Sequence, residues 1–329
     1  MAYGLADLQK LWSATTIVEL REESLWLNLC TQNEDTARWR SGIHTVNIPA
    51  PDWAGNDTPN PSEGVVAESR ARGGNWATPR RGDQDVIPFT RSGGFSTANE
   101  VLYEDAMELP WPVVERTRSR QIYTLRRQID HGIYSRVNAS VPSGAGNTIA
   151  LGSNANSISR TPPYAAANNN ARGLPREILR QYASFLERQN VDGPGDDVGQ
   201  KYVVMAPEVF AVLLLDMEQD NYSWDLLTED LLRNNSILGS RGFRGRLHGL
   251  DLFSWNGIGI PGAGGNWEIT CGVKAAQAAE AREPVAQYFD PNTNQVSDAP
   301  GHLLRQVGDY AHAGLVPSLM RKYTIDGGA

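Results

Sequence analysis

Apolar residues recur at helical spacing over a long central segment of this 329-residue chain. Between residues 111 and 137 they form one stripe along a helix, and Pro112 suits its first turn. The spacing predicts the longest helix of the chain, with arginines on its remaining faces. The stripe comprises Val114, Thr117, Ile122, Leu125, Ile129, Ile133 and Val137.

Shorter helix and strand patterns alternate from residue 174 onward. Pro175 and Pro207 each stand at the start of an amphipathic helix, and a buried-strand run, 202–205, lies between them. This alternation is typical of a compact α/β domain. Further predictions are strands at 247–255, 268–276 and 303–325, a turn at Asn256-Gly257, and a helix around Trp224, Leu227, Leu231 and Leu232.

The first hundred residues have a different texture. Residues 1–40 show helical spacing and three tryptophans, Trp12, Trp26 and Trp39, but little else that could form a core. Residues 41–105 place strand-like runs on either side of a polar stretch rich in Pro and Gly, which predicts a long hairpin. The tryptophans are candidate contacts between subunits; the alternative is a helix docked on its own domain.

Composition narrows the possible functions. The formal charge is −8 and the pI is near 5.2, which argues against tight binding to nucleic acid. Two cysteines, Cys30 and Cys271, are too few for a disulfide framework or a Cys-based zinc site. No signal-peptide pattern and no run near the ~18 apolar residues of a membrane span occurs, so we expect synthesis in the cytoplasm and no membrane contact.

Motifs for catalysis are missing from the sequence. It lacks a P-loop, the Rossmann glycine spacing, a nucleophile elbow, and the H-E-x-x-H and C-x-x-C motifs. Its five histidines lie in five different segments. We therefore expect no enzyme, no catalytic residue, no cofactor and no metal site. The alternative, a hydrolase with a dispersed active site, requires a pocket that joins a His to an acid and a nucleophile.

Three stretches carry a resemblance to a known family. "LRRQIDHGIYSRV" (125–137) looks like the end of a spine helix, and "KYVVMAPEVFAVLL" (201–214) like a strand that enters a Pro-started helix. "GFRGRLHGLDLFSWNGI" (242–258) is similar to a glycine-containing axial strand. With the order of arm, hairpin and helix, they resemble the capsid proteins of tailed bacteriophages, which have the Hong Kong 97-type fold. The end, 307–325, looks like the closing strands of the peripheral domain.

The resemblance implies an α+β fold in five parts. These are an N-terminal arm (1–40), an extended β-hairpin loop (41–105), a peripheral domain with spine helix and flexible loop (106–172), an axial α/β domain (173–268) and return strands (269–329). It implies a major capsid protein of the virion, assembled as hexamers and pentamers into an icosahedral head around double-stranded DNA. Implied partners are sister copies, a portal protein and a cement protein, with only weak, non-specific contact to the DNA.

Two departures from the family pattern change this expectation. Residues 41–105 contain no lysine, so the isopeptide cross-link that some relatives form from this loop cannot occur, and we expect a non-covalent shell. An arm of about forty residues leaves no room for a fused scaffolding region, which favours a separate scaffolding protein. The nearest alternative is an encapsulin-like compartment shell, which shares the fold.

Charge is distributed unevenly between the hairpin and the helix. Residues 41–105 carry five Arg and nine Asp or Glu, a net charge of −4, whereas residues 106–137 carry six Arg and three acids, a net charge of +3. We expect the acidic hairpin of one subunit to lie over the basic helix of its neighbour. The candidate contact residues on the helix are Arg118, Arg120 and Arg127; the alternative is two unrelated solvated surfaces.

Overall fold

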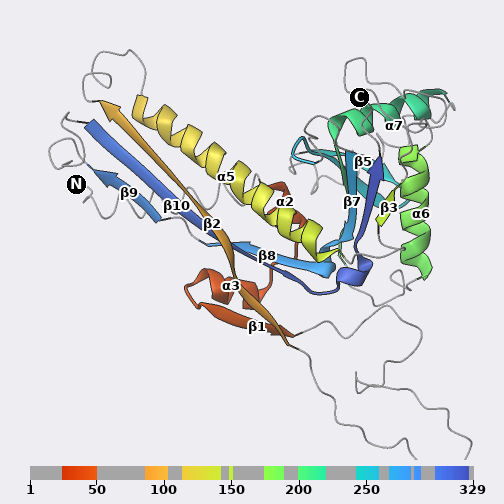
Figure 1. Cartoon of the computed structure of the whole chain (residues 1–329), viewed down its shortest axis with the longest axis horizontal. Helices are drawn as coiled ribbons and strands as arrows, with labels where there is room; N and C mark the ends of the chain where they lie inside the picture. The colour runs from red at the N-terminus through yellow and green to blue at the C-terminus, as the bar shows by residue number, and fades with distance from the viewer. Residues whose placement is uncertain are drawn as a thin grey trace, which may run out of the picture.

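The computed structural model describes residues 24–49, 86–102, 113–141, 148–150, 174–188, 199–219, 242–258, 267–282, 285–289 and 301–325. These residues form two β-sheets, one of five strands and one of six, with helices packed against both. Figure 1 shows the five-stranded sheet as an elongated wing and the six-stranded sheet within a rounder lobe. The expected α+β fold class is confirmed.

The five-stranded sheet is built around one long central strand. Its strands are β1 (Thr45–Pro49), β2 (Val86–Leu102), β8 (Gln277–Ala281), β9 (Val285–Phe289) and β10 (Gly301–Gly314). All neighbours are antiparallel. β2 lies along one side of β10, whereas β9 and β8 share its other side in succession. β1 pairs with the first five residues of β2 and extends the sheet beyond β10.

The predicted long helix is confirmed as α5 (Val113–Ser140), and it runs along this sheet (Figure 1). Small residues let the two elements approach closely. A Cβ added to Gly132 of α5 would lie 2.6 Å from the ring of Tyr310 on β10, and one added to Gly308 would lie 3.2 Å from Leu125. The side-chain amide of Gln121 adds a polar tie, because it donates to the Leu304 carbonyl at 3.0 Å.

The six-stranded sheet forms the core of the second lobe. Its order is β3-β11-β7-β4-β6-β5, in which β3/β11 and β4/β6 are parallel pairs and the other neighbours are antiparallel. The strands are β3 (Thr148–Ala150), β4 (Lys201–Met205), β5 (Phe243–Leu247), β6 (Leu250–Ser254), β7 (Trp267–Val273) and β11 (Arg321–Ile325). Two short 3₁₀ helices, Lys274–Ala276 and Pro317–Leu319, stand where the chain passes between the sheets.

Two helices belong to this lobe, α6 (Leu174–Arg188) and α7 (Pro207–Gln219). Both helices were predicted from the prolines at their starts, Pro175 and Pro207. α6 buries an apolar face that includes Tyr182, whose hydroxyl donates to the Leu319 carbonyl at 3.1 Å. None of the helices in the described ranges is both long and apolar enough to cross a membrane.

Two details differ from the sequence-based expectation. The strand expected at 247–255 is the second half of a hairpin, because His248 and Gly249 adopt positive φ angles of 52° and 75° and turn the chain between β5 and β6. The closing segment 307–325 does not stay in one domain, because β10 belongs to the five-stranded sheet and β11 to the six-stranded sheet. The helix expected around Trp224 lies outside the described residues.

Close packing at Gly132 can be tested by Gly132→Ala. Alanine favours a helix over glycine by about 1 kcal/mol. Here the added methyl group meets the ring of Tyr310, which is itself buried, so we expect a net loss of about 1–3 kcal/mol in the free energy of unfolding. Urea denaturation measures the change, with Ser135→Ala at an exposed position of α5 as the control. A variant at least as stable as wild type would contradict the packing described.

Candidate subunit interfaces

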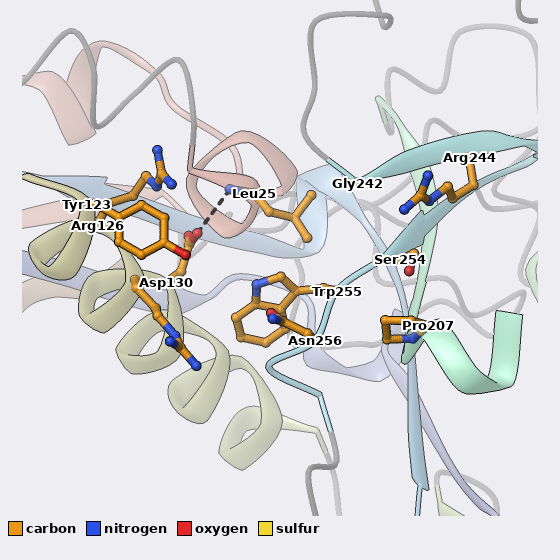
Figure 2. A pocket seen from close by; sticks show the side chains of 11 residues that line it. Leu25, Tyr123, Arg126, Asp130, Pro207, Gly242, Arg244, Ser254, Trp255 and Asn256 are labelled. Atoms are coloured by element: carbon orange, nitrogen blue, oxygen red, sulfur yellow. Dashed lines mark hydrogen bonds between the residues drawn. The ribbon is translucent and has the colours of Figure 1, made fainter. Parts of the chain in front are cut away.

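The arm begins, within the described residues, with a five-residue helix, α2 (Leu25–Leu29), that packs on α5. The carboxylate of Asp130 on α5 binds the first residues of α2. It accepts hydrogen bonds from the Ser24 hydroxyl and from the backbone N–H groups of Leu25 at 3.3 Å and Trp26 at 3.2 Å; Figure 2 shows the bond from Leu25. Burial raises the pKa of Asp130 to about 6, although these donors favour its charged form.

Trp26 lies at the centre of the main core and is fully buried. Its ring centroid is 5.1 Å from that of Tyr134 on α5, 5.7 Å from that of Trp255 after β6, and 6.4 Å from that of Tyr202 on β4. The indole therefore joins the long helix to the six-stranded sheet. The expectation that Trp26 contacts another subunit is corrected, because its whole side chain lies in the core of its own chain.

Trp39 is likewise buried in its own chain. It belongs to α3 (Glu34–Arg40), which packs on β1 and β8 and encloses a second, smaller core with Phe89. Arg282 fixes this unit, since its guanidinium lies 4.5 Å from the Trp39 ring and donates to the carbonyls of Trp39 and Ile43 at 3.0 and 3.1 Å. Trp39 therefore offers no surface to a neighbour, whereas Trp12 lies outside the described residues.

The base of the expected hairpin stands on this smaller core. β1 pairs with β2, with Thr45 opposite Thr90 at one end and Pro49 opposite Val86 at the other. The described residues end at Pro49 on β1 and begin again at Val86 on β2. The inward side chains Val46, Ile48 and Phe89 are buried. The hairpin expected at 41–105 includes only the first part of β2, because residues 91–102 of this strand pair with β10 and not with β1.

The outer face of α5 is basic. Arg120 and Arg127, seven residues apart, are exposed on this face, whereas Arg118 is half-buried and lies on another side of the helix, two residues from Arg120. The structure therefore places two of the three predicted contact residues together. Tyr123 stands among them with 53% of its surface exposed, and Arg126 lies over its ring at 4.9 Å. Exposed aromatic rings beside arginines are common in protein–protein interfaces.

A cavity of about 340 Å³ separates this face of α5 from the β5–β6 hairpin. Figure 2 shows Tyr123 and Asp130 on the α5 side, Arg244 and Ser254 on the opposite side, and Trp255 between them. Both walls carry arginines, and the cavity lies directly beside the start of α2. It could admit water or an anionic group to the junction between the two lobes.

The described residues give no support to catalysis. No three His, Cys, Asp or Glu side chains among them lie close enough to bind a metal ion. Cys30 and Cys271 are buried free thiols, and burial raises the pKa of Cys30 to about 12. Burial also lowers the pKa of His312 to about 4, assisted by Arg136, so neither group resembles an activated nucleophile or base.

Sequence reasoning missed two residues that organise this region. Asp130 interrupts the apolar stripe of α5, and a charged residue at a core position is the signal that could have identified it. Arg282 has no comparable signal, since it follows a strand like many surface arginines. Its role depends on a contact with α3, 243 residues away in the chain.

A search of the sequence against protein-family models and curated proteins finds no match. Solved structures do match. A chain from Mycobacterium phage Che8 is 15% identical and has a TM-score of 0.55, over 92% of this chain and 91% of that one. A chain from Microbacterium phage Oxtober96 is 13% identical with a TM-score of 0.53, over 93% and 91%. A chain from the mature capsid of bacteriophage PhiM1 is 12% identical with a TM-score of 0.50, over 85% and 81%.

These likenesses extend over nearly the whole chain, and they agree with the order of the elements described above. The protein has the capsid fold of tailed phages, the Hong Kong 97 type. At such low identity the likeness defines the fold and leaves the function to be argued from the surfaces of the molecule.

Proposed function

We propose that this chain is the major capsid protein of a tailed phage, and that it assembles as hexamers and pentamers into an icosahedral head around double-stranded DNA. The observation that carries the proposal is the fold itself, which phage structures match over 85% to 92% of this chain, one of them from a mature capsid. We assign the roles in the shell to the five parts expected from the sequence, except that α2 and α3 of the arm pack in the cores of their own subunit.

The hairpin is the part proposed to reach a neighbour. Its base is anchored on the small core around Trp39, and residues 50–85 join the two strands beyond Pro49 and Val86. Those 36 residues include six acids and four arginines and no lysine. An isopeptide bond from this loop is therefore chemically excluded, and the shell would be held by non-covalent contacts, a cement protein, or both.

The basic face of α5 is the proposed receiving surface. Arg120 and Arg127 give it positive charge, Tyr123 adds an exposed apolar ring, and the half-buried Arg118 lies on another side of the same helix. An acidic loop laid over this face would gain from several charge pairs at once, although each exposed pair contributes only about 0–1 kcal/mol. Contacts of this kind tolerate the small change of angle between rings of five and six subunits.

A separate scaffolding protein and a portal protein complete the proposed set of partners, and contact with the packaged DNA would be weak because the chain carries a net charge of −8. Genes next to this one provide a direct check. Portal and terminase genes would support a phage head, whereas a cargo-enzyme gene would support the alternative, a bacterial compartment.

Shortening the hairpin tests its role in assembly. Pro49 and Val86 lie opposite each other, so replacing residues 50–85 by Asn-Gly closes the strands with a two-residue turn. Because the replacement keeps every described residue of both cores, we expect the unfolding midpoint to stay within a few degrees of wild type. Electron microscopy and sedimentation, with the scaffolding protein present, should show closed shells for wild type and only small oligomers for the variant.

The outcomes of this experiment separate two failures. A wild-type chain that stays monomeric with and without scaffolding protein would contradict the proposed function as a whole. Closed shells from the shortened variant would contradict only the role assigned to the hairpin.

Charge on α5 is tested by the triple variant Arg118→Gln, Arg120→Gln and Arg127→Gln. We expect slower assembly and a weaker dependence of assembly on salt, because fewer charge pairs remain to be screened. Light scattering between low and high ionic strength measures both. The matched control is the triple Lys variant, which keeps the charge and should assemble with near wild-type salt dependence. Unchanged kinetics in the Gln variant would rule out this contact.

A further inference from the structure

Asp130 is an acidic residue inside an otherwise apolar helix face. It is 5% exposed, and its neighbours on that face, such as Ile129 and Ile133, are fully buried. A carboxylate in such a place needs hydrogen-bond donors, because burial removes its hydration. Ser24, Leu25 and Trp26 of the arm, 104 to 106 residues earlier in the chain, donate hydrogen bonds to it.

The contact also meets a need of the arm. The first N–H groups of any helix lack partners within the helix, and a side chain at the N-cap normally provides one. Ser24 occupies the N-cap of α2, but its side chain makes no capping bond and donates to Asp130 instead. Asp130, which belongs to α5, accepts these N–H groups in place of Ser24. The contact thereby fixes both the position of α2 and the direction of its axis.

We propose that Asp130 is the positioning residue of the N-terminal arm: its carboxyl group holds the start of α2 on α5, and so fixes the point on the subunit to which the preceding residues are joined. This proposal rests on the proposed function for its biological meaning, since an arm matters to a shell through its direction. The docking itself is a property of the single subunit and can be tested without assembly.

Docking is linked to a proton. Burial beneath α2 raises the pKa of Asp130 from 3.8 to about 6, whereas undocking would expose the carboxyl to the adjacent cavity and return its pKa toward the ordinary value. The docked state therefore binds the proton more tightly. Docking is strongest below pH 4, weakens as the pH rises to about 6, and is constant above that. Two pKa units correspond to roughly a hundredfold change in the docking equilibrium.

The other charged and titratable groups around Asp130 leave this sign unchanged. Arg126 on α5 favours the carboxylate and is already included in the raised pKa. Arg127 on α5 and Arg244 on β5 line the same cavity, and Cys30 after α2 stays neutral, because burial raises its pKa to about 12. His131 requires a control, since burial and Arg127 lower its pKa below 6.5.

A neutral residue of the same shape distinguishes the effect of the side chain's hydrogen bonds on docking from the effect of its protonation. Protonated Asp130 can keep Oδ1 as the acceptor of the Ser24 hydroxyl and the Trp26 N–H, and give up only the longer bond from Leu25 to Oδ2 at 3.3 Å. The amide of Asp130→Asn can do the same, with its oxygen in the place of Oδ1. This variant should keep the arm docked and lose the pH dependence. Asp130→Ala offers no acceptor, so it should weaken the docking of α2 and raise the frequency of its local opening.

Hydrogen exchange of the full-length, unassembled subunit measures docking. The reporter is the segment 24–30, and the internal reference is 113–122 of α5. After correction for intrinsic exchange, wild-type protection at pH 5 should exceed that at pH 7.5 by roughly tenfold. Asp130→Asn should show equal protection at both values, and Asp130→Ala should lose at least tenfold at pH 7.5 with the reference segment unchanged.

Two controls make the result specific. Glu115→Gln repeats the acid-to-amide change at an exposed position of α5, and His131→Gln removes the nearby histidine; both should keep the wild-type pH profile. Wild-type protection in Asp130→Ala, or a wild-type pH profile in Asp130→Asn, would overturn the proposal. If Asp130→Ala does not fold, the profile of Asp130→Asn decides. Shell formation is scored separately, so a failure of assembly cannot be mistaken for a failure of docking.

Discussion

The burial of Trp26 between the long helix and the six-stranded sheet is the contact on which the rest of the subunit depends. The five-stranded wing and the second lobe share one continuous core, and this indole lies where they meet, against Tyr134, Tyr202 and Trp255. Removing a buried Trp costs about 3–5 kcal/mol in typical cores, a large part of a domain's stability. A segment that looks like a loose arm in the sequence is thus a structural part of the subunit.

This arrangement separates parts that stabilise the subunit from parts left for its neighbours. α2 and α3 are held by the main core and by the small core around Trp39, so neither is free to exchange between copies without exposing tryptophan. Among the described residues, the basic face of α5 remains as a surface for a neighbour, and residues 50–85 are the segment proposed to bind it in the assembled shell. Polar, adjustable contacts suit a closed shell, in which one surface must fit more than one local angle.

The sequence predicted the elements better than the contacts between them. The stripe of α5, the Pro-started helices and the strand 202–205 follow from local periodicity, which depends only on neighbouring residues, and the structure has them nearly where expected. The destination of Trp26 could not be read in the same way, because a lone apolar cluster in a terminal segment looks the same whether it packs on its own chain or on another.

Glycine and charge mark the other limits of sequence reasoning. The turn at His248-Gly249 was hidden by the continuous apolar alternation around it, and only the positive φ angles reveal two strands. In the sequence Asp130 is one of three acids in a basic helical segment, and nothing near it indicates that its partners are the N–H groups of a distant segment. Long-range partners of this kind are fixed by the assembled core and leave no local pattern.

A reconstruction of the assembled shell at side-chain resolution would test this account most directly. The account predicts that Trp26 packs against Tyr134 and Trp255 of the same polypeptide, while the loop beyond Pro49 and Val86 lies on the long helix of an adjacent copy. A map in which Trp26 fills the core of a different subunit, or in which that loop folds back over its own helix, would contradict it.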